Sequence, residues 1–483
     1  MLFNDFVYIF VFVPIVFFSF FSLIKLKNVK VAKFFLFFSS VFFYCWESVT
    51  YLPLLLFSIV FNYCISKGIN ITNTIKYRKL LLTIGIICNL LILGFFKYIN
   101  ITIDSLDYIF SITVFHISFP LAISYYTFQQ VAFLIDSFRQ EINKYTFLDY
   151  AIFVSFFPQL ISGPIILQQE IMPQLAILQK KLNFKNIAIG LFIFTIGLFK
   201  KVVIADTFAV WADSGFDVAN NLDFFEAWAT SLSYTFQIYF DFSGYTDMAI
   251  GSALLFNIKI PTNFNSPYKS TNIREFWRRW HITLSRFLKN YIYIPLGGSK
   301  KGDRKTYNNL MITFIVAGLW HGAGWNFLLW GVLHGIALII HRYWDKSGFR
   351  LWKRLSWLLT FAFINCSWIF FRSKNFEDAI NILSSMFSLK NIVIYQFLKN
   401  TLSFLSTYGI KFDIMFQNMN GSKWTFILIF IGFIFVLCFK NSNEIIKELK
   451  SNYTYLVFGI TIFLISILYL NSIRETVFIY NDF

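Results

Sequence analysis

Charged residues are scarce in this chain. Only 14% of its 483 residues are Asp, Glu, Lys or Arg, whereas 57% are hydrophobic. This is too little polar surface for a water-soluble globule of this length. We therefore expect a polytopic membrane protein, and an all-α one, since spans of this composition cross lipid as helices.

Cysteine is also rare, and its spacing argues against two kinds of site. The five cysteines lie in or beside apolar runs without CxxC spacing. Neither a disulfide framework nor a zinc site is indicated, and no metal is predicted. We expect packing roles for Cys45, Cys64, Cys88, Cys366 and Cys438.

Acidic residues are outnumbered by basic ones, 25 against 42, which gives a net charge of +17. Such a charge can indicate nucleic acid, but the basic residues fall in short loops between apolar spans. That distribution follows the positive-inside rule, so we predict no nucleic-acid partner. The basic loops at 25–33 and 67–79 are then cytoplasmic, which puts the N-terminus outside.

No cleavable signal sequence is evident. The first apolar run, 6–24, is preceded by Asp5 rather than by a basic cluster, and no small-residue cleavage pattern follows it. We also find no soluble domain, internal repeat or low-complexity tract. The sequence predicts one membrane-embedded domain over 1–483, with about a dozen spanning or partly spanning helices.

The apolar runs give the approximate limits of these helices. The run at 108–135 is expected to be one helix kinked at Pro120. The other runs that we expect to span after the first lie at about 34–46, up to 65, 80–96, 187–199, 228–256, 309–320, 325–343, 357–371, 424–439 and 455–470.

One apolar run, 150–167, does not fit a single crossing. It contains Pro158, Gly163 and Pro164, and basic residues lie on both sides of it. Helix breakers are tolerated at membrane depth where the backbone lines a cavity inside the protein. We predict a re-entrant or broken helix pair; the alternative is an ordinary kinked span.

Chargeable residues gather in one stretch, 272–335, where His281 and His321 each follow a tryptophan. A helix that starts near Asn309, beside the basic residues at 300–305, would carry His321 ~18 Å into a ~30 Å hydrocarbon core. An ionisable residue at that depth indicates function. His321 is thus a candidate catalytic base. The alternative is a hydrogen-bonded structural histidine. Glycines 318, 322 and 324 suit either a ligand or tight helix packing.

The first half of the stretch alternates basic and aromatic residues. This pattern predicts an amphipathic helix where membrane meets cytosol. It could receive a phosphorylated donor such as coenzyme A, by charge and by stacking, or it could anchor on anionic lipid. Composition leaves both open. The donor-entrance candidates are Arg278, Arg279, Trp280, Arg286 and Lys289.

Carboxylates and histidines outside this half are weaker candidates. Asp241 and Asp247 interrupt an apolar run, where a charge is costly unless it is paired or solvated by water. We interpret them as interior residues that support the site, although one could lie at an interface. His116, His334 and His341 have no carboxylate or cysteine at ligand spacing, so we expect packing or interface roles.

We note the segments FFPQ at 156–159, GLFKKVVIAD at 197–206, YFDFSGYTDMAIG at 239–251, NFNSPY at 263–268, FWRRWHITLS at 276–285, WHG at 320–322 and FIY at 478–480. They closely resemble segments of the membrane-bound O-acyltransferases, in particular the bacterial alginate O-acetyltransferase membrane subunit and the similar peptidoglycan O-acetyltransferase subunits. The resemblance implies a helical bundle with its active-site core at about 120–345. It also implies that His321 is the membrane-embedded catalytic histidine and that His281 is the second active-site position, where many eukaryotic members carry Asn.

The resemblance further implies a reaction. Acetyl-CoA, on the cytoplasmic side of a bacterial inner membrane, would donate an acetyl group without any tightly bound cofactor. A separate periplasmic or extracellular acetyltransferase would place it on an exported or cell-wall polysaccharide, alginate-like or peptidoglycan. His321 would be the general base and His281 would orient the thioester or stabilise the oxyanion, with Asn326 or backbone N–H groups as weaker candidates. Tyr480 is a possible acyl relay, or an interfacial aromatic residue.

Two alternatives remain. One is transfer of D-alanine from an acylated carrier protein to teichoic acid. The other is a transporter or flippase without covalent chemistry. A transporter should show paired charges in the middle of the membrane, or inverted repeats, and the sequence shows neither.

Overall fold

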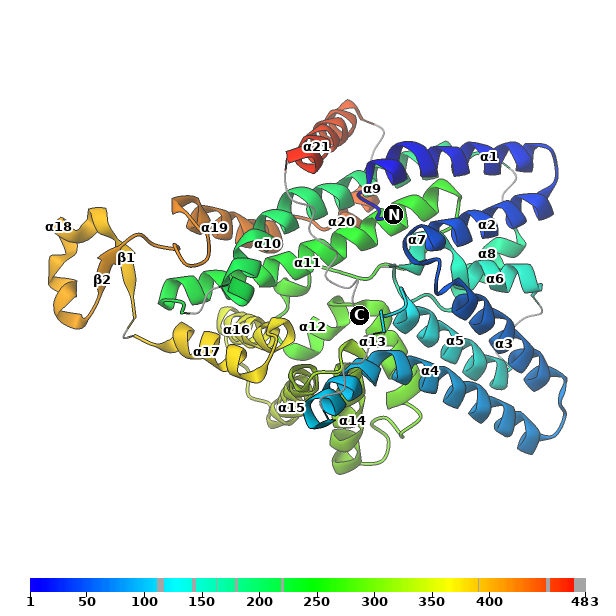
Figure 1. Ribbon diagram of the computed structural model, residues 1–483, viewed down its shortest axis with the longest axis horizontal. Coiled ribbons are helices and arrows are strands. Elements are labelled where there is room, and N and C mark those ends of the chain that lie inside the picture. Colours follow the sequence, from blue (N-terminus) through cyan, green and yellow to red (C-terminus); the bar gives the residue numbers. More distant parts are fainter. Residues whose placement is uncertain are drawn as a thin grey trace.

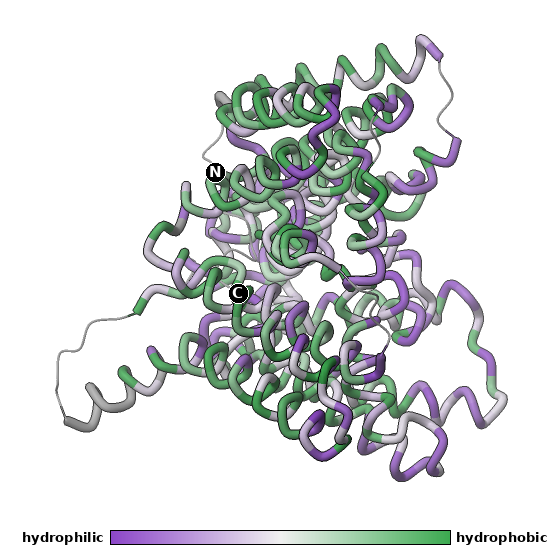
Figure 2. The backbone as a smooth tube through the Cα atoms, turned by 90° about the vertical axis from the view of Figure 1, so that its right-hand side faces the viewer, coloured by the Kyte–Doolittle hydropathy of each residue, from purple (hydrophilic) through white to green (hydrophobic). Residues whose placement is uncertain are grey.

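The computed structural model describes residues 1–110, 117–140, 145–161, 163–178, 181–218, 221–389, 391–448 and 452–472. Helices make up most of these residues and only two short strands are present among them, so the all-α prediction is confirmed (Figure 1). By length and composition, eight of the described helices can cross a membrane, or nine if the bent pair α19 and α20 forms one span. The helices are mainly hydrophobic, with hydrophilic residues mostly at their ends and in loops (Figure 2). The chain is a multi-pass membrane protein.

The N-terminal part is a group of long helices connected by short loops. Proline stands in the first turn of α3, where its missing N–H costs no helical hydrogen bond. Helices α3, α4 and α5 pack against one another. The elements are η1 (Tyr8–Phe12), α1 (Val13–Lys25), α2 (Val29–Ser48), α3 (Leu52–Ile71), α4 (Ile75–Phe110) and α5 (Ile123–Phe138).

The prediction of a single kinked helix over 108–135 is wrong. Helix α4 continues to Phe110, and α5 begins only at Ile123. Proline has no backbone N–H and disfavours the helical conformation in the residue before it, so Pro120 separates two helices instead of bending one. Ala122 then takes a left-handed conformation, with φ at +62°, and directs the chain into α5.

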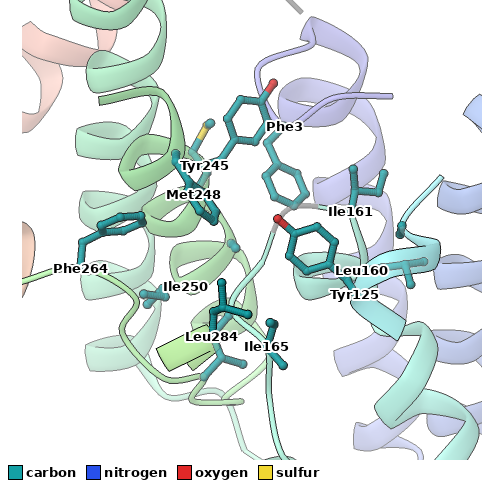
Figure 3. Packing of buried hydrophobic residues seen from close by; sticks show 14 of the residues in the cluster. Phe3, Tyr125, Leu160, Ile161, Ile165, Tyr245, Met248, Ile250, Phe264 and Leu284 are labelled. Carbon is teal, nitrogen blue, oxygen red and sulfur yellow. The ribbon is translucent and has the colours of Figure 1, made fainter. Parts of the chain in front are cut away.

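The broken segment predicted near 150–167 is confirmed. It consists of α6 (Phe147–Ser155), the single turn α7 (Phe157–Leu160) and, after a non-helical stretch, α8 (Gln168–Ala176). A Cβ at Gly163 would lie 2.4 Å from the Gln159 Cα, so this tight turn admits only glycine. The stretch is buried: Figure 3 shows Leu160 beside Tyr125 of α5, and Ile165 beside Leu284.

The middle of the molecule is built around α11 (Phe224–Leu255), which is buried along nearly its whole length. Asp223 and Glu226 form a capping box at its start. A bent helical run lies against it: α9 (Phe184–Phe199), the π-helical turn η2 (Lys200–Ala205), α10 (Asp206–Asp213) and η3 (Ser214–Val218).

Glycines allow α9 and α11 to approach closely. A Cβ at Gly197 would lie 2.5 Å from the Gly244 carbonyl oxygen, and one at Gly251 would lie 2.5 Å from the Gly190 carbonyl oxygen. Small residues at facing positions are the usual means of tight helix packing in membranes. Because α9 and α11 run antiparallel, the two pairs fix both their spacing and their register.

The C-terminal half surrounds the other side of α11 and ends in helices near the N-terminal group. A short segment between α17 and α19 extends away from the bundle, where β1 pairs in parallel with β2, Val393 opposite Lys411 (Figure 1). The elements are η4 (Pro267–Lys269), α12 (Ile273–Arg279), α13 (Ile282–Leu288), η5 (Lys289–Tyr293), α14 (Asp303–His321), α15 (Trp325–Ser347), α16 (Lys353–Arg372), α17 (Phe376–Phe387), β1 (Val393–Tyr395), η6 (Gln396–Leu398), α18 (Lys399–Leu402), η7 (Ser403–Tyr408), β2 (Lys411–Asp413), α19 (Lys423–Cys438), α20 (Ser442–Glu448) and α21 (Tyr453–Ser472).

The glycine contacts predict that Gly197→Ala lowers stability. The new methyl group would overlap the α11 backbone, and overpacking of this kind costs about 1–3 kcal/mol. Gly94→Ala in α4 is the matched control, since nothing lies within 4 Å of its Cβ position. Thermal unfolding of the detergent-solubilised protein should show a lower Tm for Gly197→Ala only. Equal Tm values would mean that the α9–α11 contact is loose.

Candidate active site

Two buried histidines lie against the Trp320 indole. His321 is the last residue of α14, with 3% of its surface exposed. His281 lies between α12 and α13 and is fully buried. The centroid of a Trp320 ring is 6.3 Å from that of His281 and 4.8 Å from that of His321. The fold thus brings together the two histidines that the sequence singled out.

The chain leaves the helical conformation at His281, so the prediction of one amphipathic helix here is wrong. Helix α12 ends at Arg279, α13 begins at Ile282, and His281 between them has φ at +39°. Tertiary backbone bonds hold this break: the Asn265 amide donates to the Arg279 carbonyl and the Ile282 amide to the Asn263 carbonyl, both at 2.9 Å. The amphipathic pattern could not show these partners.

The residues predicted to form a donor entrance do not share one surface. Arg278 and Lys289 are exposed. Trp280 is 2% exposed and packs among aromatic rings, 5.1 Å from Phe264 and 5.0 Å from Trp368 between centroids. Trp280 is therefore part of the hydrophobic core near His281 and is not available for stacking at the surface.

The other two basic candidates form ion pairs. Arg286 makes a bidentate contact with Glu170 of α8, at 2.6 and 2.7 Å. Arg279 pairs with Glu275 one turn earlier, at 2.9 Å. Bidentate arginine–carboxylate contacts are directional as well as strong. The Arg286 pair ties the broken segment to α13, close to His281.

His321 lies in an aromatic pocket between α14, α15 and α16. Its ring centroid is 5.1 Å from a Trp330 ring and 5.1 Å from Phe371. Helices α14 and α15 cross closely here. A Cβ at Gly318 would lie only 2.4 Å from the Phe327 carbonyl oxygen, so the lack of a side chain at Gly318 allows this approach. Gly322 faces the Phe327 ring with no room for a Cβ. These two glycines therefore serve helix packing.

Lys97 is a neighbour of the site that the sequence analysis missed. Its ammonium group donates to the Trp320 carbonyl, and the Tyr98 hydroxyl donates to the Leu319 carbonyl at 3.0 Å. The last four carbonyls of a helix have no partner within it. Helix α4 thus caps the end of α14 just before His321, with which Lys97 also interacts electrostatically. The available signal was a lone lysine at the end of an apolar run.

Asn326 and His334 support the same region from α15. The Asn326 side-chain amide donates to the Ser373 carbonyl at 2.9 Å, which ties the start of α15 to the end of α16. His334 is buried, receives a bond from the Trp277 indole at 3.2 Å and lies 3.1 Å from the Ser367 hydroxyl. Both His334 nitrogens are occupied, as expected of a packing residue.

Three other candidates from the sequence are His116, His341 and Tyr480. His341 is half-buried on α15. His116 and Tyr480 lie outside the described residues, so their predicted roles stay predictions. Among the residues that the structure describes, no group of three or more His, Cys, Asp or Glu side chains could hold a metal ion.

Asp241 and Asp247 are interior residues of α11, 1% and 6% exposed. Asp247 pairs with Lys200 at 2.6 Å, and Asp241 lies 3.2 Å from Lys201, which also pairs with Asp206 at 2.6 Å. These ion pairs are interior charges that the sequence analysis did not pair. The helix continues through η2 and carries both lysines against α11, whereas the sequence placed them at a helix end.

The family model of the membrane-bound O-acyltransferases matches residues 108–377, which include both histidines and Trp320. The chain belongs to the membrane-bound O-acyltransferase family. It is an O-acyltransferase.

Three curated proteins are similar to this chain to different degrees. The peptidoglycan O-acetyltransferase of Helicobacter pylori is 44% identical, over 100% of this chain and 98% of that protein. The probable alginate O-acetylase AlgI of Pseudomonas aeruginosa is 37% identical, over 80% of this chain and 75% of that protein. The teichoic acid D-alanyltransferase of Bacillus subtilis is 26% identical, over 53% of this chain and 69% of that protein.

The helix cap predicts that Lys97→Met lowers acyl-transfer turnover by up to about 100-fold, because small misplacements of a catalytic group are costly. Tyr98→Phe, which removes only the neutral donor, should cost less. Lys79→Met on the exposed side of α4 is the matched control. Turnover in isolated membranes, normalised to folded protein, is the measurement. An equal loss in Lys79→Met would trace the effect to insertion of α4 and not to the cap.

Proposed function

We propose that this O-acyltransferase takes an acetyl group from acetyl-CoA on the cytoplasmic side and passes it across the membrane for O-acetylation of an exported or cell-wall polysaccharide. The observation that carries the proposal is the pair of buried histidines against Trp320, in a chain 44% identical to a peptidoglycan O-acetyltransferase. That identity favours peptidoglycan over an alginate-like acceptor. D-alanyl transfer from a carrier protein is the second candidate, supported by lower identity over half of the chain.

The chemistry assigned to His321 is general-base catalysis. The thioester carbonyl carbon is attacked by a hydroxyl oxygen while His321 takes the hydroxyl proton. The new C–O bond forms, the C–S bond breaks, and the proton passes from His321 to the departing thiolate. A neutral imidazole can accept the hydroxyl proton, and the imidazolium that forms can donate it to the thiolate. The cap from α4 and the packing of Trp330 and Phe371 fix where the His321 ring lies.

Exposed basic residues support entry of an anionic donor from the cytoplasm. Arg278, Lys289 and the lysines at 300–301 are exposed. Asp303, the acidic residue of this loop, is bound by Lys346 and Arg342 of α15. The Lys346 hydrogen bond holds the pKa of the Asp303 carboxyl below its ordinary value, so Asp303 stays ionised within this ion-pair cluster. An adenosine phosphate group would meet unpaired positive charge at Arg278 and Lys289.

The proposed orientation has an outside N-terminus in a bacterial inner membrane. Two contacts support one common cytoplasmic end: Lys33 pairs with Asp149 at 2.6 Å, and Arg78 donates to the Phe138 carbonyl at 2.7 Å. Both basic residues lie near the start of a helix, Lys33 in α2 and Arg78 in α4, where positive charge is in excess. A separate periplasmic or extracellular acetyltransferase would receive the acetyl group at the opposite end.

The broken segment is the proposed lining of the path through the protein. Its Ile165 amide donates to the Thr283 hydroxyl at 3.0 Å, two residues after His281. Irregular backbone at membrane depth is tolerated where it lines a cavity inside the protein. Tyr480 remains a proposed acyl relay on the outer side, with a Tyr480→Phe variant as its direct probe.

His321→Ala should reduce acetyl transfer by at least about 10²–10⁴-fold, the usual contribution of a general base. Membranes holding each variant receive labelled acetyl-CoA, and the label is followed into the exported glycan. His341→Ala, on the half-buried side of α15, is the matched control and should behave as wild type. Undiminished transfer by His321→Ala would exclude the base. Label from carrier-bound D-alanine, but not from acetyl-CoA, would favour the second function.

Removing the exposed charges should weaken donor binding without slowing the chemistry. In the double variant Arg278→Gln, Lys289→Gln, we expect a higher KM for acetyl-CoA, an unchanged kcat and a weaker dependence on salt. Lys399→Gln with Lys423→Gln removes the same charge from exposed positions elsewhere. An unchanged KM in the first pair would mean that the donor enters by another route.

A further inference from the structure

Asn263 holds the His281 ring through one oxygen. This oxygen, Oδ1, lies 3.1 Å from His281 Nδ1, 3.2 Å from the Thr283 backbone nitrogen and 2.9 Å from the Thr283 hydroxyl. Asn263 is 1% exposed and His281 is fully buried, so water does not compete for these contacts. Three groups thus converge on a single side-chain atom beside the site.

The backbone N–H of Thr283 decides which atom that is. A backbone N–H can only donate, so the side-chain atom that faces it is the carbonyl oxygen and not the amide nitrogen. An amide oxygen can only accept. His281 Nδ1 must therefore carry a proton and donate it to Asn263. In a neutral imidazole the other nitrogen, Nε2, then carries the lone pair.

A small polar cavity is lined in part by Asn263, whose amide nitrogen is the other polar atom of the side chain. The cavity has a volume of about 10 Å³, the size of one water molecule. Its lining includes Asn263, Ser243 and Thr246, together with the Lys200–Asp247 ion pair. The Asn263 amide nitrogen and the Ser243 and Thr246 hydroxyls are buried beside this cavity and have no hydrogen-bond partner among the described residues.

We propose that Asn263 is a positioning residue that keeps the His281 proton on Nδ1, so that Nε2 accepts a hydrogen bond from an O–H or N–H group of the bound substrate. This rests on the proposed acyl-transfer function. Nε2 is buried and has no hydrogen-bond partner among the described residues. The expected role of His281 as an oxyanion stabiliser needs an N–H at that nitrogen, which the neutral ring held by Asn263 does not offer. His281 instead orients substrate by accepting.

The first test is the tautomer itself, measured on wild type. With ¹⁵N-labelled histidine, the full-length protein in lipid should give one neutral ring protonated at Nδ1 that is lost in His281→Gln. The chain has five histidines, so the comparison is tractable. A His281 signal protonated at Nε2 would overturn the proposal. The result does not depend on acetyl transfer, so it stands apart from the proposed function.

The second test replaces the acceptor. Asn263→Asp keeps an oxygen acceptor and should keep both the tautomer and activity near wild type. Asn263→Leu keeps the shape, removes the acceptor and should reduce transfer by about 10- to 100-fold. Asn265→Ala is the control, because the Asn265 side chain is exposed and binds Asn441 at 2.9 Å. Full activity of folded Asn263→Leu would also overturn the proposal.

The steady-state constants identify which substrate supplies the donor group. If the loss in Asn263→Leu lies in the KM for acetyl-CoA, the amide N–H groups of its pantetheine arm are the partners of His281. If the loss lies in the KM for the acceptor, the partner of His281 is the acceptor hydroxyl. A uniform loss with lowered Tm, not rescued by Asn263→Asp, would show that Asn263 serves stability alone.

Discussion

The close contact of α9 with α11 is the constraint on which the rest of the structure depends. Glycines at facing positions let the two backbones touch, and in lipid this packing replaces the hydrophobic effect as the force between helices. The same contact determines which charged residues meet in the interior. Once the register is fixed, Lys200 and Lys201 of η2 meet Asp247 and Asp241 of α11, so groups too costly to bury singly are buried as pairs.

The candidate active site is then assembled by tertiary polar contacts, each of which satisfies a group that a helix leaves unpaired. Lys97 and Tyr98 take the last carbonyls of α14 and so hold His321 at a helix end. The loop at 263–265 takes the backbone groups freed where α12 stops, which leaves His281 in a left-handed turn. Both histidines therefore lie at interruptions of helices, where a side chain can face the interior and the backbone is still bonded.

Much of this could be predicted because lipid limits the choices. Long apolar runs with basic loops between them allow only helices, and Pro158, Gly163 and Pro164 mark a break that the fold contains. His321 was found for a related reason: a chargeable residue in such a run is rarely accidental. Lys97 carried the same signal but was missed, because a lysine at the end of an apolar run also fits an ordinary loop residue.

The sequence by itself determined the fold class, most helix limits and the two histidines, since composition and spacing act locally. Only the tertiary structure decided how these residues meet. Pro120 separates helices, α12 stops before His281, and Trp280 packs in the core, because partners far along the chain supply the missing hydrogen bonds and contacts. No local pattern records that Asn263 faces His281 and Thr283 together, and that contact fixes which nitrogen of the ring carries the proton.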